Sequence, residues 1–300
     1  MYNLLIENDV FTGSDRHYTN GLRLSWLSAQ EDVPDYIRRF ADAMPFIRPN
    51  ALLRAGYAIG HNIYTPNDIS TTALVPDERP YAGYLYGGFA VVADAETILD
   101  TWALDLGIVG PSARGEEVQN GFHRLIGSPQ AMGWSNQLRD EVTVSLTHER
   151  KWRHLWEHPE SGYGADLTPH MGIGLGNLAT YANAGLTLRV GEHLGRDFGP
   201  PRIRPSLPGS AFFAPSNKFS WYLYAGVDGR AVARNLLLDG NTWQTSHHVD
   251  SKTWVGDLQV GAVLTFPKFR LTYTHVFRSK EFDGQDSGDH FGALSLTAFF

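Results

Sequence analysis

The sequence predicts an all-β protein, a twelve-stranded antiparallel transmembrane β-barrel with a short helix in an extracellular loop near the rim. Three features carry this prediction: apolar and polar residues alternate in segment after segment, the apolar side is continuous between segments, and Trp, Tyr and Phe gather near segment ends. Period-two alternation gives a strand one apolar and one polar face. A membrane barrel needs that pattern with the apolar face outside, because in lipid every backbone group must be paired and no sheet edge can stay open.

The alternation divides the chain into strand-sized segments. In 218–232, for example, Phe219, Trp221 and Leu223 alternate with small or polar residues, which are the predicted inner set. The twelve predicted strands are 3–12, 19–29, 51–62, 81–94, 97–109, 137–151, 166–177, 180–191, 218–232, 252–266, 269–280 and 290–300. An even number suits a closed barrel, and the terminal Phe300 is typical of outer-membrane barrels.

Composition and length indicate one domain covering residues 1–300. No low-complexity or Ser/Gly-rich linker divides the 300 residues. The 8 Trp, 13 Tyr and 16 Phe need an apolar place to lie, which a lipid-facing wall provides. No run approaches the roughly 18 apolar residues that a transmembrane helix needs. No signal-peptide pattern precedes Asn3, so Met1 is expected to begin a processed form.

Charge and cysteine content exclude several classes of site. The chain has no cysteine, which excludes disulfides and thiolate metal sites and suits an oxidising periplasm. The formal net charge of −7 argues against a nucleic-acid partner, although acidic residues still suit a divalent cation.

A soluble barrel or sandwich is the alternative to the membrane barrel. It would show the same alternation with the apolar face inward. The long polar loops and the polar, Gly-rich inner positions favour the membrane reading. With the first strand starting at the periplasm, the segments expected outside are 9–19, 63–80, 110–136, 233–251 and 281–289. Segments 29–50 and 192–217 then lie on the periplasmic side and are longer than such turns usually are.

Two polar clusters therefore share the outer rim, one within residues 7–21 and the other within 116–124. The second cluster lies on a predicted helix, 114–127, with Val118, Phe122 and Leu125 forming an apolar stripe at i, i+4 and i+7. We expect that stripe to lie against the barrel. Gln119 and His123 stand one turn apart on a neighbouring face and point together toward a partner surface, and the sequence after Ile126 ends the helix.

Each cluster also has a purely structural explanation. A lone histidine on an amphipathic helix is more often a packing residue than a catalytic one. Asp9 and Asp15 can pair with Arg16 or Arg23 inside the barrel, a common way to fill a polar lumen. Asn8 and Asp9 are adjacent on a strand, so both serve one site only if the strand end bends.

Three motifs, in order along the whole chain, resemble the outer-membrane lipid A 3'-O-deacylase family. They are Glu7-Asn8-Asp9-x-Phe11 with Asp15-Arg16-x-Tyr18-Thr19-x-Gly21; Asp77-Glu78-Arg79-Pro80-Tyr81-Ala82-Gly83; and Gly110-Pro111-x-Ala113-x-Gly115-x-Glu117-Val118-Gln119-Asn120-x-x-His123-Arg124-x-Ile126-Gly127. The resemblance implies a twelve-stranded barrel in the bacterial outer membrane, which uses calcium to remove the 3'-linked acyloxyacyl group of lipopolysaccharide and has its active site toward the cell exterior. We expect a monomer.

The resemblance also implies roles for individual residues. His123 is the general base that activates water, with Asn8, Asp9, Thr19 and Gln119 around it and Ca²⁺ as the oxyanion hole. Asp9 is the strongest expected calcium ligand because it alone of this set carries a full negative charge; Thr19 and Gln119 add neutral oxygens.

The chain differs from some family members at one position of the helix motif, and two of its arginines are candidate substrate contacts. Some family members carry an acid soon after the glycine that closes the helix motif, where this chain reads Gly127-Ser128-Pro129-Gln130. If that acid helps to hold the ion, calcium binds more weakly here. Arg16 and Arg79 are candidate contacts for lipid A phosphates, although such arginines more often make rim ion pairs.

Two other functions remain open at this stage. One is an outer-membrane esterase that acts on glycerophospholipid, and the other is a non-enzymatic porin or adhesion barrel whose acidic rim binds calcium for structure. The lipid that loses a fatty acid distinguishes the first from a lipid A deacylase. Solute conductance or ligand binding without acyl release would indicate the second.

Overall fold

A computed structural model describes residues 1–8, 17–30, 32–153, 156–159, 163–200 and 218–299. Its strands are β1 (Tyr2–Asn8), β2 (His17–Leu27), β3 (Leu52–Thr65), β4 (Ala82–Asp94), β5 (Ile98–Val109), β6 (Glu141–Trp152), β7 (Trp156–Pro159), β8 (Tyr163–Gly176), β9 (Ala179–Glu192), β10 (Ser220–Asn235), β11 (Trp254–Thr265), β12 (Phe269–Arg278) and β13 (Asp289–Ala298). The α-helices are α1 (Asp35–Ala43), α2 (Gly115–Ile126) and α3 (Leu236–Asp239), and single 3₁₀ turns are η2 (Pro111–Ala113), η3 (Trp134–Asn136) and η4 (Leu194–Arg196).

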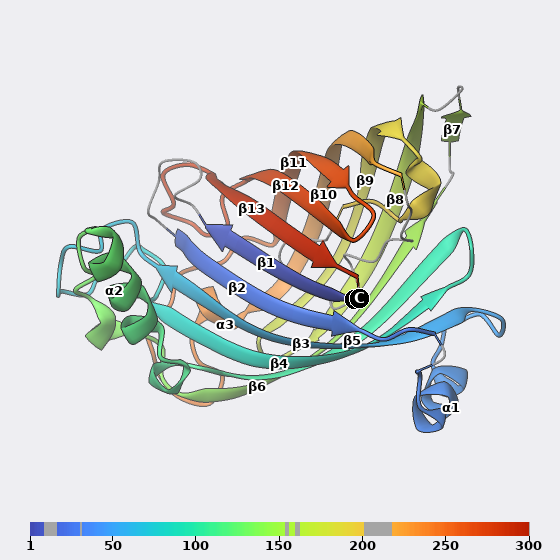
Figure 1. Ribbon diagram of the computed structural model, residues 1–300. Coiled ribbons are helices and arrows are strands. Elements are labelled where there is room, and N and C mark those ends of the chain that lie inside the picture. Colours follow the sequence, from blue (N-terminus) through green and yellow to red (C-terminus); the bar gives the residue numbers. More distant parts are fainter. Residues whose placement is uncertain (9–16, 31, 154–155, 160–162, 201–217, 300) are drawn as a thin grey trace.

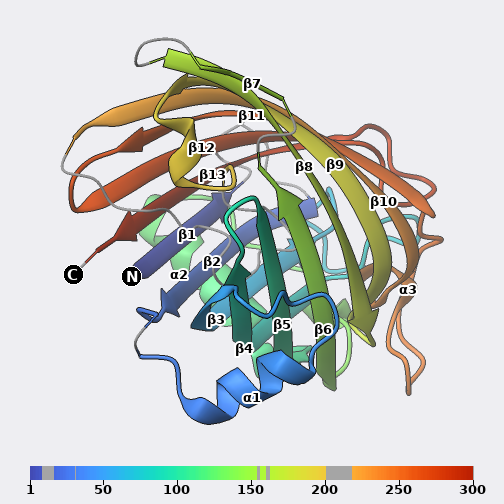
Figure 2. The ribbon, with the colours of Figure 1, turned by 90° about the vertical axis from the view of Figure 1, so that its right-hand side faces the viewer.

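Within these residues, twelve strands form the closed antiparallel barrel that the sequence predicts (Figures 1 and 2). Successive strands pair with one another, the first strand β1 pairs with the last strand β13, and β6 pairs with β8. The short β7 pairs with β8 alone, as an addition at one end of the wall. Four residues are too few to show the alternation that predicts the other strands, which is why the sequence does not reveal β7.

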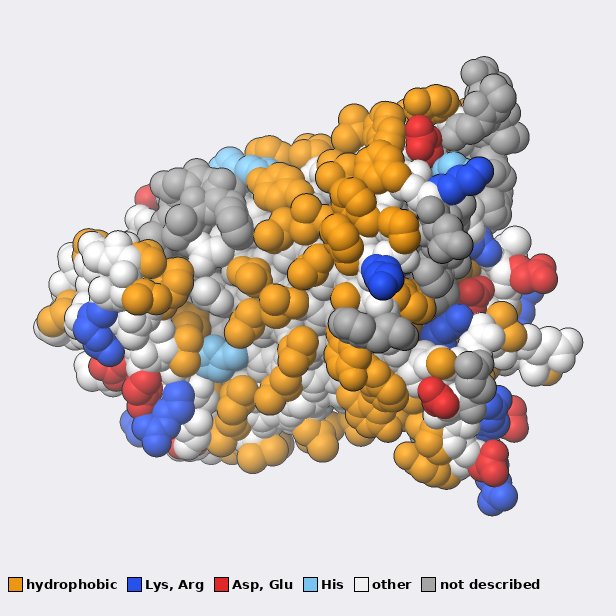
Figure 3. Space-filling model, in the orientation of Figure 1, with side chains coloured by type: hydrophobic (Ala, Val, Ile, Leu, Met, Phe, Trp, Pro, Cys, Tyr) orange, Lys and Arg blue, Asp and Glu red, His pale blue; other side chains and the backbone are white. Residues whose placement is uncertain are grey.

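The outer wall is apolar. Strands around the barrel expose large apolar side chains, among them Leu24, Ile59, Leu106, Val144, Leu175, Leu188, Leu223, Leu258 and Leu296. Figure 3 shows a broad apolar band on one face of the wall. In a water-soluble protein such a continuous exposed band would be unstable, whereas against lipid it needs no cover. The apolar face therefore points outward, which excludes the soluble barrel or sandwich.

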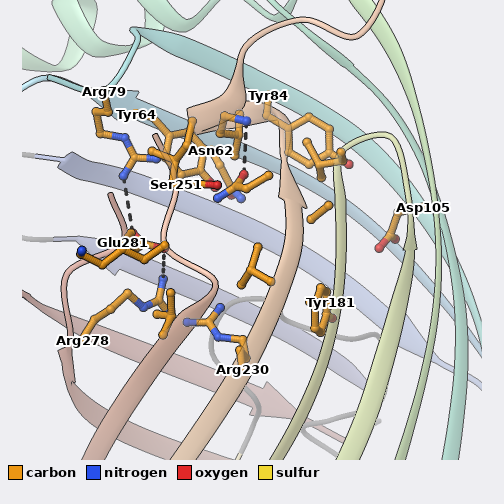
Figure 4. Close-up of a pocket in the computed structure, with 18 of the residues that line it drawn as sticks. Asn62, Tyr64, Arg79, Tyr84, Asp105, Tyr181, Arg230, Ser251, Arg278 and Glu281 are labelled. Atoms are coloured by element: carbon orange, nitrogen blue, oxygen red, sulfur yellow. Dashed lines mark hydrogen bonds and ion pairs between the residues drawn. The ribbon is translucent and has the colours of Figure 1, made fainter. Parts of the chain in front are cut away.

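The lumen is filled with charged and aromatic side chains. Asp257 accepts hydrogen bonds from Arg278 at 2.7 and 2.8 Å and from Arg230 at 3.2 and 3.3 Å. Glu281 lies 3.4 Å from Arg278 and 3.7 Å from Arg79. The three arginines and Glu281 border an internal cavity of about 150 Å³ (Figure 4), where ion pairing offsets the cost of burying charge.

Loops narrow both ends of the lumen. At one end the buried side chains of α3 pack with lumen aromatics such as Tyr64 and Tyr84. At the other end Phe198 packs against Leu27 and Leu99. We call these ends the α2 rim and the α1 rim, after the helix that lies outside the barrel at each (Figure 1).

The two longer helices flank the barrel rather than cross it. Helix α1 falls in segment 29–50, which the sequence predicts as a long turn, and its Ile37 and Ala41 pack on Ala55 and Val91 of the wall. Helix α2 matches the predicted helix 114–127 closely. In the part of the chain that is described, no helix is both long and apolar enough to cross a membrane.

Candidate active site

Helix α2 turns its polar face to the barrel. Gln119, Asn120 and His123 are buried, whereas Val118 and Phe122 are 47% and 43% exposed. The expectation that the apolar stripe lies against the barrel is therefore wrong. Spacing identifies an apolar face but not the medium around it, and on a protein whose outer wall is apolar the usual order of inside and outside is reversed. Gln119 and His123 are both on the buried side of the helix, as the companion expectation requires.

Glycines let α2 approach the wall closely. A side-chain carbon on Gly83 of β4 would lie only 2.9 Å from the backbone nitrogen of Gly115, the first residue of the helix. Just before the helix, the carbonyl oxygen of Ala113 accepts a hydrogen bond of 2.7 Å from Nε2 of His61 on β3. The start of α2 is thus fixed to two neighbouring strands, which explains why both glycines appear in the motifs.

His123 is held in one tautomer. Its Nδ1 lies 2.5 Å from the carbonyl oxygen of Pro129, just beyond the helix. Because a carbonyl oxygen can only accept, Nδ1 must carry the hydrogen, and in neutral imidazole the lone pair is then on Nε2. A backbone acceptor on Nδ1 is a common way to orient a histidine whose other nitrogen takes a proton or a metal. In this tautomer Nε2 is the nitrogen that can accept a proton.

Asn120 holds the segment that carries the Pro129 carbonyl. Its Nδ2 donates to the carbonyl oxygen of Ala131 at 3.1 Å, and its Oδ1 accepts from the backbone nitrogen of Ala131 at 2.8 Å. The side chain is buried, so these two hydrogen bonds satisfy polar groups that would otherwise need water. Sequence reasoning quoted Asn120 in a motif without assigning it a role, because nothing in the sequence shows which backbone groups an amide will meet.

Gln119 is oriented by Trp134. Its Oε1 accepts a hydrogen bond of 2.9 Å from Nε1 of Trp134, which is itself 1% exposed. Turning the amide over would place two donors against each other, so the contact fixes which end faces the indole. Among the described residues, Nε2 of Gln119 is buried without a hydrogen-bond partner. The tryptophan packs on Tyr81 and Ile63, which connects α2 to the wall.

Thr19 lies on the wall beside that contact. The register of β2 on β3 shifts between Tyr18 and Asn20, which makes Thr19 the extra residue of a β-bulge. Its Oγ1 lies 2.9 Å from Oγ1 of Thr65, two residues along β3 from Ile63 and on the same face. The bend expected between Asn8 and Asp9 lies at the end of β1, where Asp9 falls outside the described residues, so it stays a prediction.

Asn8 faces outward at the end of β1. The preceding Glu7 points into the lumen, where its Oε2 accepts a hydrogen bond of 2.6 Å from Tyr18, and successive side chains of a strand point to opposite faces. Asn8 pairs across the ladder with Asn20 of β2 and is buried although it lies on the outer side. Asn8, Thr19 and the buried face of α2 thus occupy the outer side of the barrel at the α2 rim.

The other predicted site residues lie elsewhere or outside the described residues. Asp9 and Arg16 fall in 9–16, of which nothing is described. Arg79 is 2% exposed and points into the lumen, with its guanidinium 4.8 Å from the centre of the Tyr64 ring and beside Glu281 (Figure 4). Arg79 lies in the loop before β4 and is paired inside the lumen, which speaks against the expected contact with a lipid A phosphate.

A comparison with protein families matches residues 1–300 to the family described as outer membrane protein LpxR. The chain belongs to this family. The resemblance that the motifs indicate, to outer-membrane lipid A 3'-O-deacylases, is confirmed, and the protein is an outer membrane protein. A search of curated proteins finds no match.

One solved structure has the same fold as this LpxR family member. LpxR from Salmonella typhimurium matches with a TM-score of 0.83 and 22% identity over 100% of this chain and 99% of that chain. The β domain of the Bordetella autotransporter BrkA matches with a TM-score of 0.49 and 12% identity, covering 100% and 98%. The autotransporter NalP translocator domain of Neisseria meningitidis gives 0.40 and 10%, covering 100% and 88%.

The donor set of the site suits a hard cation. Asn8, Thr19 and Gln119 offer amide and hydroxyl oxygens, which Ca²⁺ prefers. Trp134 occupies one lone pair of the Gln119 oxygen and leaves the second for a ligand. In the described residues no group of three His, Asp or Glu side chains is arranged to hold a metal, and Asp9 lies outside that range. Among the described residues, a calcium site here would have only neutral oxygens to draw on, and Asp9 stays a predicted ligand.

The charged groups on α2 lie away from this donor set. Arg114 donates to Glu117 at 2.5 Å, and this hydrogen bond lowers the pKa of Glu117 below its ordinary value. Both side chains are exposed. Glu116 and Glu117 lie in the first turn of the helix, where the macrodipole favours negative charge. These acids stabilise the start of the helix.

Proposed function

We propose that this protein is a calcium-dependent ester hydrolase that removes the 3'-linked acyloxyacyl group of lipid A, with its active site toward the cell exterior. Membership of the LpxR family supports the reaction class. The observation that carries the mechanism is the contact between Nδ1 of His123 and the Pro129 carbonyl, because it leaves Nε2 as the proton acceptor.

In this mechanism Nε2 of His123 takes a proton from a water molecule as the water oxygen attacks the carbonyl carbon of the 3'-ester. The bond between that carbon and the sugar oxygen then breaks, and the imidazolium returns the proton to the sugar oxygen, which leaves as a hydroxyl. The Pro129 carbonyl stays on the Nδ1 hydrogen throughout and stabilises the positive ring. No serine nucleophile is needed.

The remaining residues position the reacting groups. Asn8 orients water or substrate, and the buried Nε2 of Gln119 is a donor on the same helix face as His123. Asp9, Thr19 and Gln119 are the residues that would hold Ca²⁺, which when bound supplies positive charge to the developing oxyanion. The Trp134 contact keeps Gln119 oriented before substrate arrives, so less reorganisation accompanies the reaction.

The test is to incubate the purified protein in detergent with lipopolysaccharide, with calcium or with a chelator, and to analyse lipid A by mass spectrometry. Loss of one 3'-linked acyloxyacyl unit only with calcium is the expected result. An unchanged lipid A from folded protein contradicts the proposal, and release of fatty acid from glycerophospholipid in a parallel incubation would then favour the phospholipid esterase.

The porin alternative has its own readout. The Arg–Asp network in the lumen and the packing of α3 leave little room for solute flow. We therefore expect no ion conductance above background in planar bilayers at neutral pH. Stable single-channel steps without acyl release would favour the porin.

A further inference from the structure

Helix α2 exposes an apolar face that is large for its length. Val118, Phe122, Leu125 and Ile126 are 47%, 43%, 82% and 49% exposed, whereas its polar Gln119, Asn120 and His123 are buried. At about 25 cal/mol per Å² of apolar surface, a helix in water would bury this face and expose the amides. The arrangement is stable only if the medium beside the face is itself apolar.

The charged residues of α2 lie on the opposite side. At 3.6 residues per turn, Glu117 and Arg124 project away from Phe122, and both are exposed. The helix thus has three faces: one on the barrel, one apolar and one charged. A helix that lies in a membrane interface has this division, with its apolar side toward the acyl chains and its charged side toward water.

The apolar face continues the lipid-facing wall. Gly83, the point where β4 touches the start of α2, is followed by Leu85, two residues or about 7 Å further along the strand toward the middle of the wall. Leu85 is exposed, as is Leu106 of β5 at 54%. Figure 3 shows apolar side chains from the barrel band reaching the region of the α2 rim.

We propose that α2 is an interfacial helix whose face of Val118, Phe122, Leu125 and Ile126 contacts the acyl chains of the outer leaflet. The occupant of this face is membrane lipid rather than a second copy of the chain or another protein. Resting on the proposed function, this gives the substrate path: a lipid reaches His123 laterally from the leaflet, with its acyl chains still in the membrane, and not through the lumen.

The chain has no cysteine, so single spin labels can test this directly. The variants are Leu125→Cys on the apolar face, Arg124→Cys on the charged face and Leu106→Cys on the barrel wall. Each labelled protein is reconstituted in vesicles of rough lipopolysaccharide, phosphatidylethanolamine and phosphatidylglycerol. Collision with oxygen, which concentrates in lipid, is compared with collision with a water-soluble nickel chelate.

Oxygen should dominate at Leu125→Cys as at Leu106→Cys, and the nickel chelate at Arg124→Cys. Dominance of the nickel chelate at both helix positions would overturn the proposal, because the face would then lie in water. Protection of Leu125→Cys from both reagents would overturn it too, since a protein surface would then cover the face. Val118→Cys provides a second label on the face if Leu125→Cys does not fold.

A kinetic readout links the face to the reaction. Leu125→Asp should raise KM several-fold for lipopolysaccharide in vesicles and change kcat little, with Arg124→Asp as the charged control that leaves KM nearly unchanged. Equal KM values for Leu125→Asp and the wild type in vesicles would contradict lateral entry. The spin-label result needs no turnover, so an enzyme inactive on lipid A would refute the proposed function without deciding the position of α2.

Discussion

The Nδ1 atom of His123 lies 2.5 Å from the carbonyl oxygen of Pro129, six residues further along the chain. A helix cannot make this contact with its own carbonyls. It exists because Gly127, in the left-handed region at φ 73°, ends α2 and turns the chain back beneath the ring. One backbone reversal thus sets the tautomer of the predicted base.

Replacing His123 with Ala should lower kcat for lipid A deacylation by at least about 100-fold, the usual contribution of a general base. Barrel formation should be unaffected, because the histidine contacts its own loop. Lipid A product measured by mass spectrometry, together with the heat-dependent gel shift of the folded barrel, checks both statements. His248→Ala, an exposed histidine of the same rim, is the matched control. A fully active His123→Ala protein would remove the mechanism.

Replacing Asn120 with Ala should lower kcat by about 10- to 100-fold with a smaller change in KM, as is typical when an orienting partner is lost. The backbone groups of Ala131 would lose their buried partners, so the carbonyl of Pro129 would no longer be fixed. The pH profile of kcat should shift as well, because Nδ1 loses a fixed acceptor. Asn136→Ala, which removes an exposed contact to Thr72, is the control. An unchanged pH profile would indicate a purely structural role for Asn120.

Replacing Trp134 with Phe should lower kcat about fivefold and raise the calcium concentration needed for half activity. The ring packing is kept, but the hydrogen bond that orients Gln119 is lost, at a cost of about 1 kcal/mol. Calcium titration of deacylation measures both effects. Trp243→Phe, at an exposed rim position, is the control. If Trp134→Phe titrates with calcium as the wild type does, Gln119 does not bind the ion.

Replacing Asp197 with Asn should destabilise the barrel and reduce its sensitivity to acid. Burial alone would raise the pKa of Asp197, but Arg270 and Arg189, together with the backbone nitrogen of Gly199, outweigh it and lower the pKa. A lowered pKa means that the stabilisation is present above the unfolded value of about 3.9 and is lost as pH falls through the folded value. Breaking such a buried pair costs about 3–5 kcal/mol.

Urea unfolding in detergent, followed by tryptophan fluorescence at pH 7 and pH 3, measures this effect. The wild type should lose more stability between the two pH values than Asp197→Asn. Asp283→Asn, which removes an exposed partner of Lys252, should behave as the wild type does. Equal acid sensitivity of Asp197→Asn and the wild type would show that other carboxylates govern the transition.

The sequence predicts the wall well because alternation is a local property. The predicted strand 218–232 and the observed β10, Ser220–Asn235, differ by only a few residues at the ends. The sequence predicts less well which surroundings a side chain faces. It cannot show whether the Val118 stripe meets protein or lipid, or that Arg79 turns to Glu281 in the lumen, since both depend on surroundings that only the closed barrel creates.

The candidate site was predictable in part for the same reason. The spacing of Gln119 and His123 on one helix is a local pattern, and both side chains are buried in the structure. The contact between Asn120 and Ala131 joins a side chain to a backbone that any residue could supply, so no residue type marks it. The positions of Asp9 and Arg16 remain predictions.

The contacts that orient the site join residues close together in the sequence, whereas those that close the barrel join residues far apart. His123 to Pro129, Asn120 to Ala131 and Gln119 to Trp134 span 6, 11 and 15 residues, whereas Asn3 reaches Ser295 across 292. Short loops close faster than long ones, so the α2 segment and the barrel can form at different rates during folding. A barrel that has sealed without docking α2 would pass every bulk test of folding and still be inactive. The specific activity of a preparation should therefore be calculated from the amount of protein in which α2 is docked on the barrel, and not from the total amount of folded barrel.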